Sequence, residues 1–335
     1  MGSYWMDHFF STDSVALPRF LSLSADDCAP LLASLGLPVV PGITHESAEN
    51  RVFGFGEVTI KFFRPGRWSL DALGDEANFL EDLVAAGLDV VKPIGRPATW
   101  QGMHYQLYET VAPPFDLDPK VLTPAQLRAH VHLVAEMHRV GAQRDAPHRP
   151  HLRPLETGAE LLAVVRRGGY LPAELDARYA DLVGQLCAWL AAEMDGVPTQ
   201  RVHDDPGTWN VLWRPQGPLL MDLDDFNVGP VAIDLAIMDI PYRLSTLPAD
   251  MPRAERRPLQ RAKVLEFYRE VADFPEEWER MFVPLRGMRG LFFDAWFSAR
   301  WADPGFADCY PDDTLTEPSW WRDNLDRIEQ LLAMR

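Results

Sequence analysis

The sequence predicts an α+β protein with two lobes: a small N-terminal antiparallel sheet with one main helix, and a larger, mostly helical C-terminal part. Strand-like alternation concentrates before about residue 110, and helical spacing dominates after it. The 335 residues also exceed the size of one typical compact domain. We therefore expect an N-terminal lobe at residues 1–110, with an extension at 1–25, and a C-terminal lobe at 111–335.

The N-terminal lobe is predicted to contain a short helix at about residues 26–37, which ends at Gly36. Residues 49–63, ENRVFGFGEVTIKFF, alternate around Gly56, which is typical of a β-hairpin with glycine in its turn. Helical spacing runs from Leu70 to Ala86, and Gly87 closes that helix. Two more strands are expected in VVKPIGRP and HYQLYETVAPP, residues 90–97 and 104–114.

The C-terminal lobe is predicted to begin with a helix capped by Thr123, with Pro124 in its first turn, that ends at Gly141. DAPHRPHLRP, residues 145–154, reads as a surface loop, and helices follow in ELLAVVRRGG and from Tyr179 to Met194. VLW and LLM, residues 211–213 and 219–221, are expected as two short strands around a turn. Helices then dominate to the end of the chain.

The charge balance restricts the partners. Lys and Arg number 32 against 49 Asp and Glu, so the net charge is 32 − 49 = −17. Such a surface repels nucleic acids and anionic membranes, whereas a nucleotide that arrives with Mg²⁺ brings its own positive charge. Three scattered cysteines without a CxxC pair predict neither zinc nor disulfides. With no signal peptide or transmembrane run recognised, we expect a monomeric cytoplasmic protein.

Acidic residues crowd around apolar runs in RVHDDPGTWNVLWRPQGPLLMDLDDF, residues 201–226. Buried carboxylates are costly unless they are paired or bound to metal. Phosphoryl transfer needs a carboxylate for the attacking hydroxyl and oxygen ligands for Mg²⁺. Asp205, Asn210 five residues later, and Asp222 on the following hairpin supply these groups.

A lysine on the second strand of the N-terminal hairpin completes the constellation. VTIK, residues 58–61, has the form of the strand whose lysine contacts the α- and β-phosphates of ATP. Alternation points Lys61 away from Ile60 and Phe62, towards a cleft between the lobes. Glu76, on the next helix, is the predicted ion-pair partner that holds Lys61 in place.

With these motifs the chain resembles the aminoglycoside-phosphotransferase and choline-kinase branch of the bilobal protein-kinase-like fold. Within that branch it is similar to the bacterial stress-response kinases, and KFFRPGRW and DLDDFNVGP are the most discriminating segments; ENRVF, LVAEMHRVG and RWADPGF also match. The resemblance implies ATP- and Mg²⁺-dependent phosphorylation of Ser or Thr on a protein substrate, including autophosphorylation. It places Asp205 as catalytic base, Asn210 and Asp222 as metal ligands, and Lys61 on the phosphates.

The nucleotide is expected to contact Ser47 and the segment that joins the lobes; the expected residues are Ser47, Lys61, Tyr108, Glu109, Thr110 and Val111. The loop at residues 47–51 lacks a glycine-rich signature, so phosphate contacts there would come from Ser47 and backbone N–H groups. Asp204 stands where the family usually has glycine. Aspartate tolerates a positive φ better than most residues, and the second carboxylate can raise the pKa of one of the pair.

Other polar residues of these segments are interpreted as structural. We expect His203 to hold the catalytic loop, Asp234 to brace it, and His138 to be buried and hydrogen-bonded. Asp224 and Asp225 read as structural, with Asp225 slightly ahead as a functional candidate. For Arg64 and Arg67, the sequence supports contact with a substrate and exposure in a solvated loop equally well. Both interpretations stay open.

Three alternative functions remain. A small-molecule kinase on the same fold would phosphorylate a hydroxyl of an aminoglycoside, choline or a sugar. A non-catalytic nucleotide sensor would bind Mg²⁺-ATP without turnover. A sugar-nucleotide transferase would use Asp222-Leu223-Asp224 as a DxD motif, but this leaves Lys61 and the spacing from His203 to Asn210 unexplained.

Overall fold

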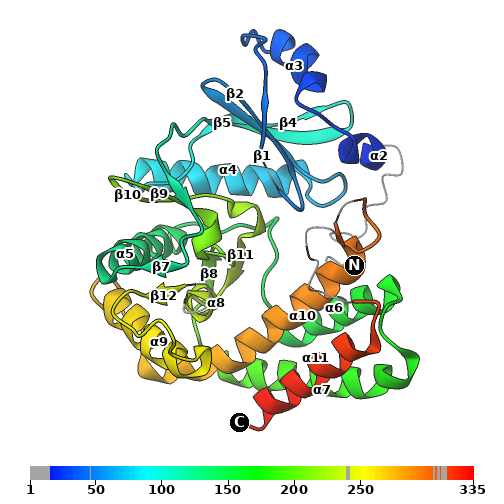
Figure 1. Ribbon diagram of the computed structural model, residues 1–335, viewed down its shortest axis with the longest axis vertical. Coiled ribbons are helices and arrows are strands. Elements are labelled where there is room, and N and C mark those ends of the chain that lie inside the picture. Colours follow the sequence, from blue (N-terminus) through cyan, green and yellow to red (C-terminus); the bar gives the residue numbers. More distant parts are fainter. Residues whose placement is uncertain (1–15, 46, 239–241, 305, 308–309, 311–314) are drawn as a thin grey trace.

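The computed structural model describes residues 16–335 except 46, 239–241, 305, 308–309 and 311–314. A five-stranded sheet with the helix α4 (Leu70–Ala85) beside it forms one part, and helices with short strands form the other (Figure 1). This arrangement confirms the predicted α+β, two-part fold. Most of residues 1–25 that were assigned to an N-terminal extension, and Cys309, lie outside the described residues.

The sheet has the order β1-β2-β3-β5-β4 with every neighbouring pair antiparallel. Its hairpin turns at Gly56, whose φ of 64° requires a residue without a Cβ penalty. The remaining elements of this part are α2 (Ala16–Leu21), η1 (Asp26–Cys28), α3 (Ala29–Ser34), β1 (Ile43–His45), β2 (Arg51–Phe55), β3 (Val58–Phe62), β4 (Pro93–Trp100) and β5 (Met103–Glu109).

The helical part inserts short strands between its long helices. Its elements are β6 (Asp116–Leu117), β7 (Val121–Leu122), α5 (Pro124–Gly141), α6 (Pro154–Gly168), α7 (Ala173–Glu193), β8 (Gln200–Val202), η2 (Thr208–Asn210), β9 (Val211–Arg214), β10 (Gly217–Leu220), η3 (Leu223–Asp225), β11 (Asn227–Gly229), α8 (Ala232–Ile237), β12 (Arg243–Leu244), α9 (Arg253–Arg269), η4 (Glu276–Met281), α10 (Phe282–Arg300) and α11 (Pro318–Leu332).

The caps and turns that the sequence predicts are present. The Thr123 hydroxyl accepts a hydrogen bond from the backbone N–H of Gln126 at 3.2 Å, and the Gln126 side chain accepts one from the Thr123 N–H at 3.0 Å. Ser69, which was not predicted as a cap, also caps α4: its hydroxyl accepts from the backbone N–H of Ala72 at 3.1 Å. The strand boundaries differ more: β4 extends to Trp100 and β5 ends at Glu109, before the prolines that follow.

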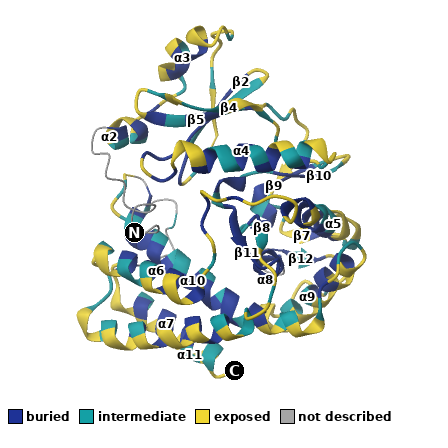
Figure 2. Ribbon diagram, turned by 180° about the vertical axis from the view of Figure 1, so that it is seen from behind, coloured by how far each residue is buried: buried dark blue, intermediate teal, exposed yellow. Residues whose placement is uncertain are grey.

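Two hydrophobic cores hold the two parts. A smaller core lies between the sheet and the N-terminal helices, where Phe20 packs with Phe53 and Phe62. The larger core fills the helical part, and α4 contributes Phe79 and Leu83 to it. In Figure 2, buried stretches alternate with exposed ones along α4. Since α4 also packs on the sheet, this helix belongs to both parts and fixes one relative to the other.

One predicted surface loop is partly buried. Within residues 145–154, the Arg149 guanidinium lies 3.7 Å from the ring centre of Trp68 and 4.2 Å from that of Phe226. Only 3% of Arg149 is exposed, because its guanidinium packs against the faces of the two aromatic rings in cation–π contacts. A proline-rich segment predicts irregular backbone, but it does not predict where one of its side chains is buried.

Among the described residues, no helix is both long and apolar enough to cross a bilayer.

Candidate active site

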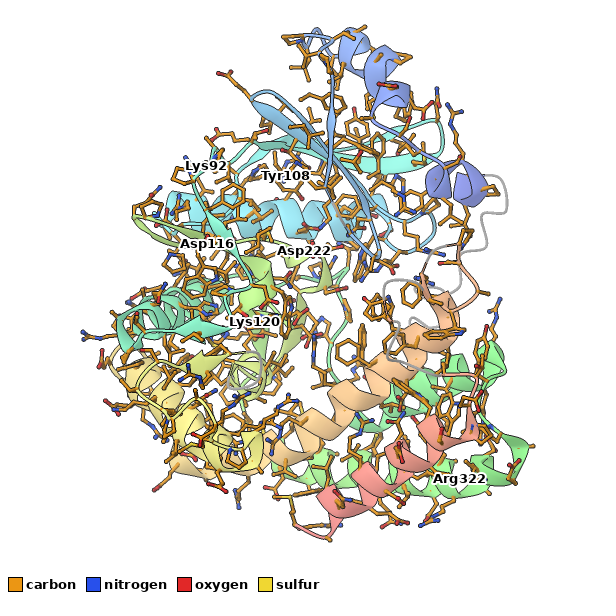
Figure 3. All side chains as sticks on the ribbon, viewed as in Figure 1. Lys92, Tyr108, Asp116, Lys120, Asp222 and Arg322 are labelled. Atoms are coloured by element: carbon orange, nitrogen blue, oxygen red, sulfur yellow. The ribbon has the colours of Figure 1, made fainter. Side chains whose placement is uncertain are left out.

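A cavity of about 760 Å³ lies between the sheet and the helical part. Its walls come from β2, β3 and β5 on one side and from the 204–225 segment and α10 on the other. Tyr108 and Asp222 face this region from the two parts, whereas Arg322 lies on the distant α11 (Figure 3). A pocket of this size that unites both lobes is the default place for a ligand.

The loop after β8 is fastened from below by buried side chains. The Asp234 carboxylate accepts hydrogen bonds from the backbone N–H groups of His203 at 2.9 Å and Asp204 at 2.7 Å. His138 lies 2.9 Å from the same carboxylate and 2.9 Å from the Tyr268 hydroxyl. These contacts confirm that Asp234 braces the loop and that His138 is buried and hydrogen-bonded.

The His203 ring holds two turns of the site together. Its Nε2 lies 3.0 Å from the Met221 carbonyl, and its Nδ1 accepts the Asp205 N–H at 3.3 Å. The ring is fully buried, so it has no path to a substrate hydroxyl. This geometry agrees with the structural interpretation of His203.

Two aspartates of the site adopt left-handed backbone. The φ values are 69° at Asp204 and 63° at Asp222, in a region that glycine enters freely and aspartate tolerates. The positive φ at Asp204 is the reason why a glycine fits this position as well. Burial, with Asp234 and Asp205 nearby, raises the pKa of the Asp204 carboxyl well above its ordinary value, against the lowering effect of Arg289.

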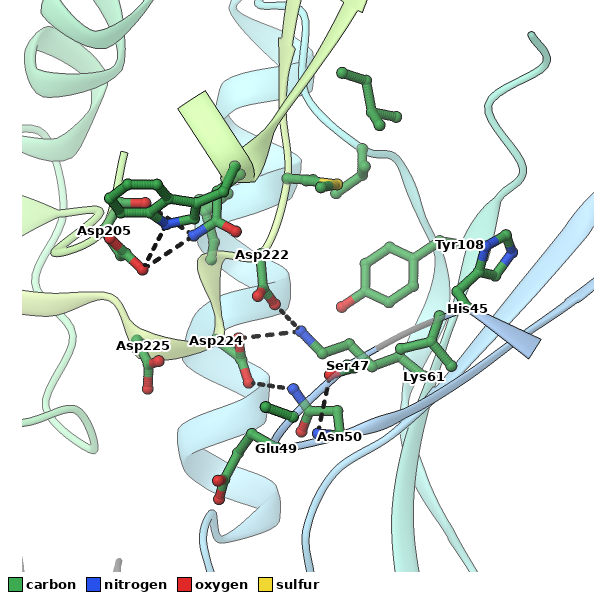
Figure 4. Close-up of a pocket in the computed structure, with 18 of the residues that line it drawn as sticks. His45, Ser47, Glu49, Asn50, Lys61, Tyr108, Asp205, Asp222, Asp224 and Asp225 are labelled. Atoms are coloured by element: carbon green, nitrogen blue, oxygen red, sulfur yellow. Dashed lines mark hydrogen bonds and ion pairs between the residues drawn. The ribbon is translucent and has the colours of Figure 1, made fainter. Parts of the chain in front are cut away.

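The Asp205 carboxylate is fixed at both oxygens. Its Oδ2 accepts from Trp209 Nε1 at 3.0 Å and from Asn210 Nδ2 at 3.2 Å, and its Oδ1 accepts from Arg289 Nη2 at 2.7 Å. Asp205 lines the cavity, so a substrate hydroxyl can reach it. Figure 4 shows the Asp205 carboxylate with the hydrogen bonds that it accepts from its own loop, one of which comes from Trp209.

The predicted metal ligands meet through the β9–β10 hairpin. Val211 pairs with Leu220, and the Met221 N–H donates to the Asn210 carbonyl at 3.0 Å. This register places Asn210 beside Asp222 at the cavity wall. The Asn210 amide nitrogen Nδ2 donates to the Asp205 backbone carbonyl at 2.9 Å and to the Asp205 carboxylate at 3.2 Å, which leaves the amide oxygen as an acceptor.

Lys61 reaches across from β3 to the helical part, but with different partners from those predicted. Its ammonium pairs with the carboxylates of Asp222 and Asp224, the latter at 3.0 Å (Figure 4). The predicted Lys61–Glu76 ion pair is not formed: Glu76 is buried and accepts from the Tyr108 hydroxyl at 3.2 Å. Two carboxylates at closer range outcompete the third for one ammonium group.

These contacts determine the charges in the site. Burial raises the pKa of Glu76 to about 7, although the Lys61 ammonium acts to lower it. Burial also acts to raise the pKa of Asp224, but the cations of Lys61 and Arg67 hold it well below its ordinary value. Asp224 is therefore the ionised anchor of Lys61. The Asp222 side chain is 42% exposed and lines the cavity, where it also pairs with Lys61.

The residues predicted to contact a nucleotide line the same cavity; they are Ser47, Lys61, Tyr108, Glu109, Thr110 and Val111. The Ser47 hydroxyl accepts from the Asn50 N–H at 3.1 Å, which shapes the loop before β2. Thr110 and Thr59 are joined by a hydroxyl hydrogen bond of 2.9 Å at the segment that links the lobes.

The sequence did not indicate several residues of this cavity. Val52, Val91 and Leu212 give it an apolar wall, and Arg289, Phe292, Phe293 and Trp296 close it from α10. The sequence favoured Asp225 over Asp224 as a functional candidate. In the described part of the chain, however, Asp224 is the one of these two aspartates that contacts Lys61. Its hydrogen bond to Asn50 Nδ2, at 3.0 Å, joins residues 174 positions apart. No local pattern announces such contacts.

The interpretation of Arg64 and Arg67 as solvated loop residues was wrong, because Arg64 is only 5% and Arg67 only 7% exposed. Contact with a substrate stays a prediction for Arg67, which lines the cavity, whereas Arg64 is not among the residues that line it. Arg64 pairs with Asp303 at 2.6 Å. Arg67 pairs with Asp225 and lies 3.3 Å from Asp224. Both arginines therefore hold the sheet against the helical part.

A cleft between a sheet and a helical part, with a lysine on one side and an Asp–Asn–Asp set on the other, is typical of phosphotransferases. The profile of the phosphotransferase enzyme family matches residues 43–281. The chain belongs to this family, and it is a kinase.

Individual proteins give the same assignment. The serine/threonine protein kinase RdoA of Salmonella typhimurium LT2 is 30% identical over 324 residues, which cover 93% of each chain. Stress response kinase A of Escherichia coli K12 is 30% identical over 329 residues, 94% of this chain and 95% of that protein. The amicoumacin kinase hAmiN, solved with AMP-PNP, Ca²⁺ and amicoumacin, has a TM-score of 0.70 at 15% identity, covering 92% of this chain and 94% of its own.

Proposed function

We propose that this chain is an ATP- and Mg²⁺-dependent serine/threonine protein kinase that acts in a stress response. The observation that supports it best is the meeting of Lys61, Asp205, Asn210 and Asp222 in one cavity. The two relatives of 30% identity over nearly the whole chain carry kinase names of this kind. We propose a lobe boundary between residues 110 and 111, at the segment that borders this cavity.

The side chains have separate roles in this proposal. Lys61 would contact the α- and β-phosphates of ATP, and the buried Glu76 would serve as a further counter-charge for its ammonium group. The adenine ring fits the apolar wall of Val52 and Leu212, next to the backbone of residues 108–111. Ser47 and the N–H groups of its loop contact the outer phosphates. Asp205 orients the acceptor hydroxyl and takes its proton.

The donor set suits Mg²⁺. Among the described residues, no group of three His, Cys, Asp or Glu side chains could enclose a metal ion. Mg²⁺ at kinase sites is instead held by one or two protein groups, substrate phosphates and water. The Asn210 amide oxygen and the Asp222 carboxylate provide such groups, since the Asn210 amide hydrogens are already used by Asp205. Mg²⁺ would neutralise phosphate charge in a cavity lined by carboxylates.

The test is the Asp205→Ala variant with labelled ATP. Loss of the carboxylate removes the group that receives the hydroxyl proton, and we expect transfer to fall by at least about 10²-fold. Binding of a fluorescent ATP analogue with Mg²⁺ is expected to stay within about twofold. Asp205 contacts no residue of the proposed adenine wall, and Asn210, the proposed Mg²⁺ ligand, keeps its hydrogen bond to the backbone carbonyl of residue 205 in this variant. Near-normal phosphoryl transfer in this variant would contradict the assignment of Asp205 as the catalytic base.

A small-molecule acceptor is the second candidate function. The α10 end of the cavity combines the rings of Phe292, Phe293 and Trp296 with the carboxylates of Asp204 and Asp225, which suits a cationic molecule. A panel of amino alcohols, sugars and aminoglycosides incubated with labelled ATP separates the two. Label on Ser or Thr of protein, including this chain itself, supports the first function, and label on a small molecule supports the second.

The remaining proposals concern partners and place. We propose a protein substrate with an accessible Ser or Thr, no nucleic acid partner in view of the net charge of −17, and a monomer that works in the cytoplasm. The described cysteines, Cys28 and Cys187, are buried and unbridged, which suits a reducing compartment.

A further inference from the structure

One face of α10 closes the acceptor side of the cavity. Arg289, Phe293, Trp296 and Arg300 follow one another at intervals of four, three and four residues, which places them on the same side of a helix. The first three line the cavity. This helix lies about 80 residues beyond the loop that carries the predicted base, and none of the catalytic motifs includes it.

Arg289 makes two hydrogen bonds to that loop. Its Nη2 donates to Asp205 Oδ1 at 2.7 Å, and its Nη1 donates to the Asp204 carbonyl at 2.9 Å. Its guanidinium also lies 4.9 Å from the ring centre of Phe293, one turn further along the helix. In the part of the chain that the structure describes, Arg289 is the one donor to Asp205 Oδ1.

The base needs such a partner for two reasons. Its Oδ2 is held by Trp209 and Asn210 from its own loop, so one further contact fixes the plane of the carboxylate. The guanidinium also places a cation directly beside the Asp205 carboxylate, and Asp205 is the nearest of the acidic groups that interact with Arg289. The exposed fraction of the Arg289 side chain is 18%, so water screens this interaction only in part.

We propose that Arg289 is a positioning residue for phosphoryl transfer, which fixes the Asp205 carboxylate relative to the acceptor hydroxyl. The inference rests on the proposed function, since it needs Asp205 to act on a hydroxyl. A lysine would keep the charge but would not span both acceptors, because only the planar guanidinium places two donors side by side. Misplacement of a reacting group by about 1 Å can cost about 10²-fold in rate.

The experiment compares Arg289→Gln and Arg289→Lys with the wild type. Transfer of labelled phosphate from ATP to dephosphorylated casein, and to the chain itself, gives kcat and the KM for ATP. We expect Arg289→Gln to lower kcat about 10²-fold and to leave the KM for ATP within about twofold. Arg289→Lys is expected to recover about tenfold of that loss. The control is Arg178→Gln, at an exposed ion pair with Glu329 on the far side of the helical part.

A double variant separates positioning from a general structural effect. In the Asp205→Ala background, Arg289→Gln is expected to cause no further loss, because residues that act as a unit are not additive. Equal losses in both backgrounds overturn the proposal, as does unchanged or increased kcat in Arg289→Gln alone. A wild-type chain that transfers phosphate to neither acceptor overturns the proposed function, and this inference falls with it.

Discussion

At the scale of single residues, the site depends on backbone conformations that few side chains accept. Asp204 and Asp222 both have φ between 60° and 70°, and the Asp234 carboxylate holds the turn at Asp204 by two N–H groups. A left-handed residue costs roughly 1–2 kcal/mol unless it is glycine. The identity of residue 204 therefore follows from its backbone, without any need for its carboxylate in the chemistry.

Substitution of Asp204 tests this explanation. We expect Asp204→Gly to fold normally and to keep kcat within about threefold, because glycine adopts the observed φ freely. Asp204→Val is expected to lower the free energy of unfolding by about 1–2 kcal/mol and to reduce kcat, because a β-branched residue resists this conformation. Thermal unfolding and labelled-ATP transfer measure both effects.

Gln101 provides the matched control, with φ of 51° at an exposed turn between β4 and β5. Gln101→Val should lower stability without a change in kcat, since this turn is remote from the cavity. A loss of activity in Asp204→Gly comparable to that of Asp205→Ala would show that the Asp204 carboxylate takes part in the reaction.

The sequence predicted the residues whose relations are local. The distance from Asp205 to Asn210 is set by five residues of one loop, and the hairpin at residues 211–220 brings Asp222 back to Asn210. Arg289 and Asp224 were missed or ranked low because their contacts span 84 and 174 residues. Such contacts depend on how the helices pack against the rest of the protein, and local residue spacing does not predict that packing.

At the scale of elements, a buried carboxyl joins three helices of the C-terminal bundle. Asp294 on α10 accepts from the Tyr179 hydroxyl on α7 at 2.5 Å and from Asn324 Nδ2 on α11 at 2.7 Å. Asp294 is 1% exposed, and burial raises its pKa to about 6, against the lowering effects of Arg327 and of the Tyr179 hydrogen bond. The sequence predicted a helix from Tyr179 to Met194 and mostly helical structure towards the end of the chain, but not the polar group that joins these helices.

The raised pKa of Asp294 predicts a pH dependence of stability. Its folded-state pKa of about 6 lies above the ordinary 3.8, so the folded state binds the proton more tightly and the free energy of unfolding falls as pH rises from 3.8 to 6. Asp294→Asn removes this titration. The variant should gain up to about 3 kcal/mol relative to the wild type between pH 4 and pH 7.

Urea unfolding of both proteins across this pH range measures the difference. Groups that titrate equally in both proteins cancel in the comparison, and Asp323→Asn, an exposed site on α11, controls for the loss of one charge. A stability difference between wild type and Asp294→Asn that stays flat with pH would contradict the assignment.

At the scale of the whole molecule, the segments that distinguish this chain meet at one junction between the sheet and α10. Glu49 precedes β2, Arg64 and Arg67 follow β3, and Arg300 and Asp303 end α10 or follow it. Arg64 binds Asp303, while Glu49 binds Arg300. The sequence indicated that these segments match one family, with KFFRPGRW as a discriminating one, and it predicted two lobes. It did not predict that the segments meet, because they converge only where the lobes pack together.

Glu49 is the centre of this junction. Its carboxylate accepts from Arg300 Nη2 at 2.7 Å and from Trp296 Nε1 at 2.9 Å, and Arg67 Nε lies 3.7 Å away. Burial acts to raise the pKa of Glu49, but Arg300 and Arg67 hold it well below its ordinary value. The loop with Ser47, which we propose to cover the phosphates, is thereby tied to the helix that contacts Asp205.

Removal of either Glu49 or Arg300 should weaken the packing between the two lobes. Arg300 is 1% exposed, so Glu49→Ala removes a carboxylate that its buried guanidinium binds, and we expect a loss of about 3 kcal/mol in the free energy of unfolding. Glu49→Ala should also raise the KM for ATP, because the loop with Ser47 loses its attachment to α10. Arg300→Met should cause a similar loss of stability, and the double variant should lose clearly less than the sum, since neither charge then remains alone.

The comparison pair is Arg166 and Asp176, whose Nε and Oδ1 atoms are 2.6 Å apart but whose side chains are 48% and 36% exposed. Because water screens this pair, the double-mutant cycle there should show much weaker coupling than at Glu49 and Arg300. Additive losses for Glu49 and Arg300, together with an unchanged KM for ATP, would mean that the lobes are held by α4 and the shared core alone. Coupling with a raised KM would instead show that lobe closure and nucleotide binding depend on the same buried ion pair.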